Sequence, residues 1–159
     1  MKAYLIDSAD RQVRPLTVLS YGSDQKPRAA EVNYSADMLQ AWYWLIDTKG
    51  SPIDVRNVGE GETLIFDDEG LFKLTEGETY PFAEFRGLDP IAGKVLLMGV
   101  DDDGDTVSTK IPQVLVERAV TFTRRTYNGI GPTTESEIDH PIFGRTVMIS
   151  SRANFGDPQ

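Results

Sequence analysis

Four aspartates surround one glycine in the stretch GVDDDGDT, residues 99–106, and so many carboxylates together raise the question of a calcium loop. An EF-hand loop needs carboxylates at positions 1, 3 and 5, glycine at position 6 and glutamate at position 12. With Asp101 as the first position, position 6 is Thr106 and position 12 is Pro112, so the motif fails twice. Asp-Gly between two β-forming runs is instead typical of a hairpin turn, with Gly104 in the left-handed region. We therefore expect a turn that needs neither a metal nor a cofactor.

A second acidic turn is expected in FDDEGLF, residues 66–72, where two apolar runs also flank acids and a glycine. We predict a hairpin here as well. If both tips lay at one end of a sheet, they would form a negative patch that binds cations weakly or meets a basic protein surface. The carboxylates assigned to this candidate partner-binding surface are Asp67, Asp68, Glu69, Asp101, Asp102, Asp103 and Asp105.

The best helix of the chain is SADMLQAWYWLID, residues 35–47, with Ser35 as its N-cap. Its core-facing stripe has helical spacing and consists of Met38, Leu39, Trp42, Leu45 and Ile46. Tyr43 and Trp44 point about 100° and 200° away from Trp42, so at least one aromatic ring should be exposed or meet another element. We assign Tyr43 and Trp44 to the partner-binding surface as anchors; the alternative is a helix between two packed layers.

His140 is the only histidine, and it follows Glu137 and Asp139 in TTESEIDH. Such a group serves as a general base when a carboxylate orients it. Its surroundings, NGIGPTTESE and then Pro141, predict an exposed loop, so a solvated histidine is the simpler interpretation. The chain contains no nucleotide-binding glycine motif, no His-Glu-x-x-His and no Gly-x-Ser-x-Gly. We assign no catalytic residue.

Composition and charge exclude several classes of protein. The chain of 159 residues has no cysteine, which excludes disulfides, thiolate metal sites and cysteine nucleophiles. No apolar run reaches the roughly 18 residues of a membrane span, and the N-terminus lacks the pattern of a signal peptide, so we expect a cytoplasmic protein. The net charge of −9 argues against nucleic acid as a partner, and the whole acidic excess lies in residues 60–105.

Short strands joined by tight turns, with one or two helices, predict an α+β fold: a single domain built mainly on an antiparallel sheet with hairpins. KVLLMGV, residues 94–100, is apolar enough for a central strand, and PQVLVERAV, residues 112–120, for a short second helix. Pro15 places VRPLTVLS at a sheet edge, which leaves room for a homodimer but does not require one. We assign residues 1–126 to the core and residues 127–159 to an exposed loop, a last strand and a frayed tail.

Three segments carry a resemblance: MKAYLID at the start, GETLIFDDEGLFK in the middle and LDPIAGKVLLMGVDDDGD after it. Together they resemble a family of small uncharacterised proteins carried by bacteriophages and plasmids, over roughly residues 1–110. The resemblance implies an accessory protein with a cytoplasmic α+β domain, in the host cell if phage-borne. It transfers no catalytic residue.

Three functional hypotheses follow from these observations. The first is a non-enzymatic phage or plasmid accessory protein that binds a host protein through its acidic surface, as an inhibitor of a host process or of defence. The second is a metal-assisted hydrolase that uses the aspartate-rich turns and His140. The third is a protein that binds a small molecule or nucleotide in a pocket between helix and sheet, lined by the aromatic residues.

Overall fold

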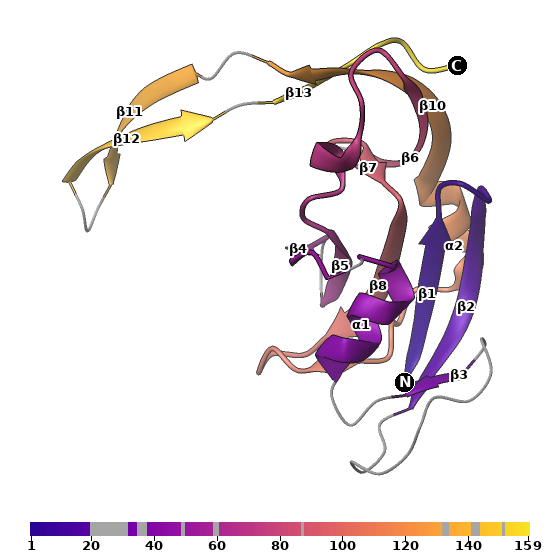
Figure 1. The fold of residues 1–159 in the computed structure, drawn as a ribbon. Helices are drawn as coiled ribbons and strands as arrows, with labels where there is room; N and C mark the ends of the chain where they lie inside the picture. Colours follow the sequence, from indigo (N-terminus) through magenta and orange to yellow (C-terminus); the bar gives the residue numbers. More distant parts are fainter. Residues whose placement is uncertain are drawn as a thin grey trace.

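The computed structural model describes residues 1–19, 32–34, 38–48, 50–58, 61–86, 88–131, 134–140, 144–150 and 152–159; among these, the side chains of residues 18, 19, 32–34, 38–41, 134–140 and 144–150 are outside the description. The strands are β1 (Lys2–Asp7), β2 (Gln12–Leu19), β3 (Val32–Tyr34), β4 (Ile53–Asn57), β5 (Glu62–Asp67), β6 (Thr79–Phe85), β7 (Ile91–Ala92), β8 (Lys94–Val100), β9 (Thr106–Val107), β10 (Val120–Ile130), β11 (Thr134–His140), β12 (Gly144–Ser150) and β13 (Ala153–Phe155). The helices are α1 (Met38–Ile46), α2 (Gln113–Ala119) and the 3-10 turn η1 (Leu71–Lys73). The chain is therefore an α+β domain, as predicted (Figure 1).

A large sheet forms the centre of the domain, with the strand order β3-β2-β1-β8-β5-β4 and with β9 paired to the end of β8. All its pairs are antiparallel except β2 with β3. A smaller sheet has the order β13-β10-β6-β7, and β11 pairs with β12 alone. β8 lies in the middle of the large sheet, so the prediction of a central strand from KVLLMGV is confirmed.

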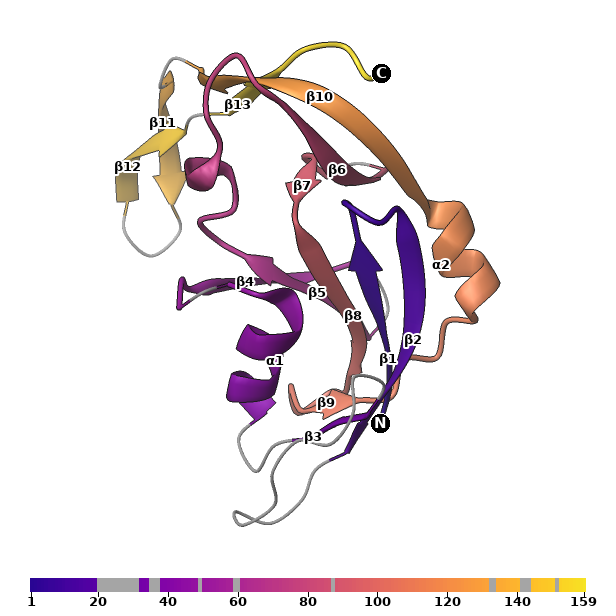
Figure 2. The same ribbon diagram turned by 45° about the vertical axis from the view of Figure 1, so that its right-hand side comes forward.

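The large sheet is covered on both faces, which explains why β1, β5 and β8 are buried at nearly every position. On one face, Leu45 and Ile46 of α1 pack against residues such as Leu96 and Met98 of β8. On the other face, Leu97 of the same strand packs with the small sheet and with Val116 of α2. Figure 2 shows α1 and α2 on opposite sides of the large sheet. The domain thus has three layers, and the strand alternation divides its core into two clusters.

The remaining predictions concern the second helix, the strand with Pro15 and the N-cap of the first helix. The second helix is confirmed as α2. The prediction that VRPLTVLS is an edge strand is wrong, because β3 pairs with Thr17–Leu19; Pro15 itself lies in the part of β2 that pairs with β1 alone among the described residues. Ser35 lies outside the described residues. Of the described helices, none is long and apolar enough to cross a membrane.

The expected hairpin around FDDEGLF is wrong. After β5 the chain forms η1, and the two neighbours of β5 are β4 and β8, so no strand returns beside it. The Asp67 carboxylate accepts the backbone N–H of Glu69 at 3.0 Å and binds the ammonium group of Lys73. These bonds join residues that are close in sequence and tighten the turn into a 3-10 segment. The segment forms in place of the expected returning strand.

The expected exposed loop over NGIGPTTESE and the frayed C-terminal tail are also wrong for the residues described. β10 continues to Ile130, and β11 begins at Thr134. The tail forms β13, where the ring of Phe155 packs 5.1 Å from Phe82, centroid to centroid. The backbone N–H of Gln159 still donates to β10, at 2.9 Å. The polar sequence did not predict β13, because its apolar contact comes mainly from one aromatic residue, Phe155.

Candidate functional site

A large hollow of the described surface is a cleft of about 1190 Å³ between the large sheet, the small sheet and α2. Its lining is mostly apolar, with a few polar groups, and consists of Asn57, Val58, Leu64, Glu84, Phe85, Arg86, Leu88, Leu97, Ile111, Leu115, Val116, Arg118, Ala119 and Thr121. A concave apolar surface with a small number of polar groups is the usual form of a binding site. We therefore take this cleft as the candidate functional site.

The floor of the cleft is made by buried residues of the core. Leu64 of β5 and Leu97 of β8 project from the large sheet, and Val116 projects from α2. Leu115 of α2 also lines the cleft, yet 48% of its surface is exposed. The apolar floor therefore continues outwards to solvent, as an interaction surface does.

Glu84 lines the cleft and binds Arg125, which lies behind it on the neighbouring strand β10 of the small sheet. The guanidinium binds both carboxylate oxygens of Glu84, with Nη2 at 2.9 Å from Oε2, and Thr123 donates its hydroxyl to the same carboxylate. These bonds, above all those from Arg125, lower the pKa of Glu84 below its ordinary value of 4.5 and raise the pKa of Arg125. The Glu84 carboxylate is thus ionised at pH 7, and the Arg125 guanidinium balances its charge. Such a carboxylate is a poor general base.

The mouth of the cleft carries two further arginines. Arg86 follows β6 and Arg118 lies in the last turn of α2; both side chains are exposed. Within the described residues neither guanidinium makes a hydrogen bond or an ion pair. Since the one lining carboxylate is already neutralised by Arg125, the cleft presents a positive rim in a protein of net charge −9. An anionic group at the mouth would have two unpaired guanidiniums to bind.

The two predicted acidic turns do not meet. In the antiparallel pair of β5 with β8, Phe66 is opposite Val95 and Glu62 is opposite Gly99. The turn after Asp67 therefore lies near the start of β8, whereas the turn at Asp101 follows its end. Five residues of β8 separate the two turns, about 17 Å of extended chain. The condition for a single negative patch is not met, and the assignment of these carboxylates to a partner stays a prediction.

Asp101 acts as the organiser of its turn. Its carboxylate oxygen Oδ1 accepts the backbone N–H groups of Asp103 and Asp105, at 3.1 and 2.8 Å. Gly104 has φ +88°, and β8 pairs with β9 across the turn. The predicted hairpin is therefore confirmed. In the part of the chain that the structure describes, no three acidic or histidine side chains come together to hold a metal ion.

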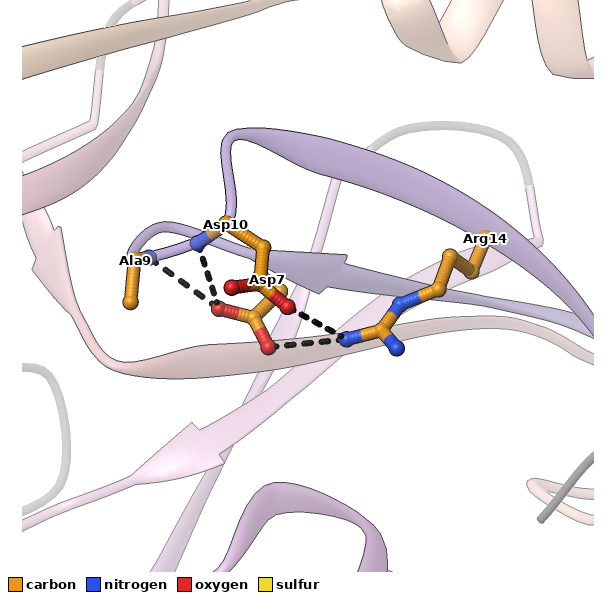
Figure 3. Close-up of polar contacts among 4 residues, drawn as sticks. All are labelled: Asp7, Ala9, Asp10 and Arg14. Atoms are coloured by element: carbon orange, nitrogen blue, oxygen red, sulfur yellow. Dashed lines mark hydrogen bonds and ion pairs between the residues drawn. The ribbon is translucent and has the colours of Figure 1, made fainter.

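A second carboxylate, Asp7, closes the turn between β1 and β2 in the same way (Figure 3). It is buried, and it accepts the N–H groups of Ala9 and Asp10 and one from the Arg14 guanidinium at 2.9 Å. Asp7 and Asp67 line a smaller cavity of about 260 Å³, together with Lys73 and Lys94. Because both carboxylates already bind cations and backbone donors, this cavity offers little unused polar capacity.

The other predicted site residues lie apart from the cleft. Trp44 is 60% exposed, Tyr43 is half-buried, and Trp42 packs against the core, so the expected outward aromatic on α1 is confirmed. However, α1 covers the opposite face of the large sheet, and Phe85 is the single aromatic among the lining residues of the cleft. His140 is the last residue of strand β11, so the expectation that it lies in a loop is wrong. The described pocket between helix and sheet therefore involves α2, and the predicted aromatics do not line it.

Sequence reasoning missed Arg86 and Arg118. They stand 32 positions apart, each beside ordinary strand or helix residues, and no spacing rule connects them. Only the pairing of β10 with β6, in which Val120 at the end of α2 is opposite Phe85, brings both to one cleft.

Comparison with known proteins gives no match: no family model matches the chain, no curated protein is detectably similar in sequence, and no solved structure is detectably similar in fold. The resemblance to phage- and plasmid-borne proteins therefore stays a prediction.

Proposed function

We propose that this chain is a non-enzymatic protein-binding module whose cleft receives an apolar, acidic segment of a partner protein. The observation that carries the proposal is the arginine rim: Arg86 and Arg118 line an apolar cleft and make no polar contact among the described residues. An apolar floor binds aliphatic side chains through burial, and the two guanidiniums select neighbouring carboxylates.

The size of the cleft favours a peptide segment over a small molecule. Pockets for small molecules measure about 300–1,000 Å³ and enclose most of the ligand. This cleft is larger, at about 1190 Å³, and its apolar floor reaches solvent at Leu115. The expectation that the partner is a host protein, drawn from the resemblance, is kept as part of the proposal.

A defined peptide set tests this function. We expect a short labelled peptide in which Glu alternates with Val to bind in fluorescence anisotropy. The matched peptide with Lys in place of Glu should bind at least about 3-fold more weakly, because exposed ion pairs contribute about 0.2–1 kcal/mol each. Raising the salt concentration should reduce the difference.

Paired variants locate the binding. Replacing both rim arginines, Arg86→Ala with Arg118→Ala, should remove the preference for Glu over Lys. Arg124→Ala is the matched control, because Arg124 is exposed on β10 and does not line the cleft. Equal binding of both peptides by the unaltered protein would contradict the proposal. Tight binding of a small amphipathic anion such as dodecyl sulfate, without any peptide binding, would favour the small-molecule alternative.

A further inference from the structure

The strands β11 and β12 form an arm, residues 134–140 and 144–150, that projects from the body of the domain (Figures 1 and 2). It continues the ladder of β10 with β13: Ile130 is opposite Ala153, and Thr134 is opposite Ser150. No third described strand pairs with the arm. A two-stranded ribbon on its own is marginally stable in water, so this one needs a surface to rest on.

The sequence of the arm alternates two chemistries in register. Glu135 is opposite Ile149 and Glu137 is opposite Val147. Since alternate residues of a strand share a face, Glu135, Glu137 and Asp139 occupy register positions of one face, opposite Ile149, Val147 and Arg145 in turn. This is the combination that an apolar cleft with a positive rim accepts.

We propose that the arm of one copy of this chain docks in the arginine-rimmed cleft of a second copy. The inference rests on the proposed function of the cleft and names a further partner beside a host protein, the chain itself. Charge complementarity supports it: β11 carries three acids, Glu135, Glu137 and Asp139, whereas the mouth of the cleft carries Arg86 and Arg118. In a protein of net charge −9, a positive apolar recess and an acidic apolar projection form a complementary pair.

The arm does not reach the cleft of its own chain. Thr121, near the start of β10, lines the cleft, and the arm leaves from the far end of the same strand. β10 has 11 residues, which span about 33 Å at about 3.3 Å per residue. Figure 2 shows the arm and α2 on opposite sides of the molecule. The contact therefore joins two different surfaces, and it closes when two copies exchange arms reciprocally or when several copies form a ring.

Two variants separate the two halves of the contact. The cleft variant carries Arg86→Glu and Arg118→Glu. The armless variant replaces residues 132–151 with Asn-Gly, because the backbone N–H of Gly131 already donates to the carbonyl of Arg152 at 2.7 Å and a two-residue turn can join them. Arg124→Glu, a reversal on β10 outside the cleft, is the matched control. Cooperative melting within a few degrees of the unaltered protein establishes that each variant is folded; Arg86→Gln with Arg118→Gln is the milder second cleft variant.

Sedimentation velocity over a range of concentrations at low salt gives the test. The unaltered protein should show a weight-average mass that rises with concentration above the 17.7 kDa of one chain. The cleft variant should associate at least about 10-fold more weakly, since two favourable charge contacts become repulsive. The armless variant should stay monomeric, and Arg124→Glu should associate normally.

Mixing the two variants gives the decisive result. The armless variant keeps a cleft and the cleft variant keeps an arm, so a mixture should form a one-to-one complex and nothing larger. Two outcomes would overturn the inference: an unaltered protein that is monomeric at every concentration, or a mixture of the variants that does not associate. If the Glu–Val peptide still binds the cleft in those cases, the proposed function stands with a different partner. If neither peptide nor arm binds, the proposed function fails as well.

Discussion

The polar wall of the cleft depends on one carboxylate. Glu84→Gln removes the charge that Arg125 binds through two oxygens, and we expect the free energy of unfolding at pH 7 to fall by about 1–2 kcal/mol. Because folding lowers the pKa of Glu84, its stabilisation is fully present above pH 4.5 and is lost as the pH falls further, through the lowered pKa. Urea denaturation of both proteins at several pH values measures the difference.

At sufficiently acid pH, Glu84 is protonated in the folded and unfolded states alike, so the gap between the unaltered protein and Glu84→Gln should close. A gap that stayed constant from pH 7 to pH 3 would mean that the ion pair does not cause it. Glu117→Gln serves as the control, because Glu117 is exposed on α2 and its carboxylate contacts Gln113 without any described cation.

A single glycine controls how closely β8 approaches the segment after β9. A Cβ atom on Gly99 would lie 2.7 Å from the carbonyl oxygen of Ser108, which is backbone and cannot turn aside. Gly99→Ala should therefore lower the free energy of unfolding by about 1–3 kcal/mol. The matched change Gly156→Ala, whose nearest contact would be 3.4 Å, should stay within about 0.5 kcal/mol of the unaltered protein. Equal effects of the two changes in chemical denaturation would contradict this account.

At the scale of elements, β13 is held by one ring. Phe155 packs edge-on against Phe82 and lies 6.2 Å from Tyr127, centroid to centroid. Phe155→Ala should cost about 1–3 kcal/mol, less than for a fully buried phenylalanine because Phe155 is only half-buried. Amide hydrogen exchange should quicken in β13 and in the second half of β10, whereas the control Asn154→Ala should leave both protected. Unchanged protection in Phe155→Ala would show that backbone pairing alone holds β13.

At the scale of the whole molecule, the arm and the body should be energetically separate. Among the described strands, β11 and β12 pair only with each other and join neither sheet of the body. Replacing residues 132–151 with Asn-Gly should therefore shift the melting temperature of dilute protein by only a few degrees. Ending the chain at residue 131 also removes β13 and its packing on Phe82, and should lower it further. Calorimetry measures the melting temperature of both forms. If both fell by the same amount, the arm would belong to the folded core.

Local patterns in the sequence determined the individual elements. The apolar run of β8 predicted a central strand because burial on both faces leaves no polar position. Asp-Gly at Asp103 and Gly104 predicted the turn, since that geometry needs only the turn residues themselves. The spacing on α1 predicted its inward stripe and an exposed Trp44. Together these patterns were enough for the α+β class.

The tertiary structure decided everything that depends on which distant residues meet. The antiparallel register of β5 with β8 sends the two acidic turns to opposite ends of the sheet, although each turn looks alike in sequence. The C-terminal strand β13 forms in a polar part of the sequence because Phe155 packs against Phe82, a contact across more than 70 residues. Arg86 and Arg118 line one cleft only because β10, which directly follows α2, pairs with β6. Local propensity acts over a few neighbouring residues, whereas these pairings are set by how the whole core is best buried.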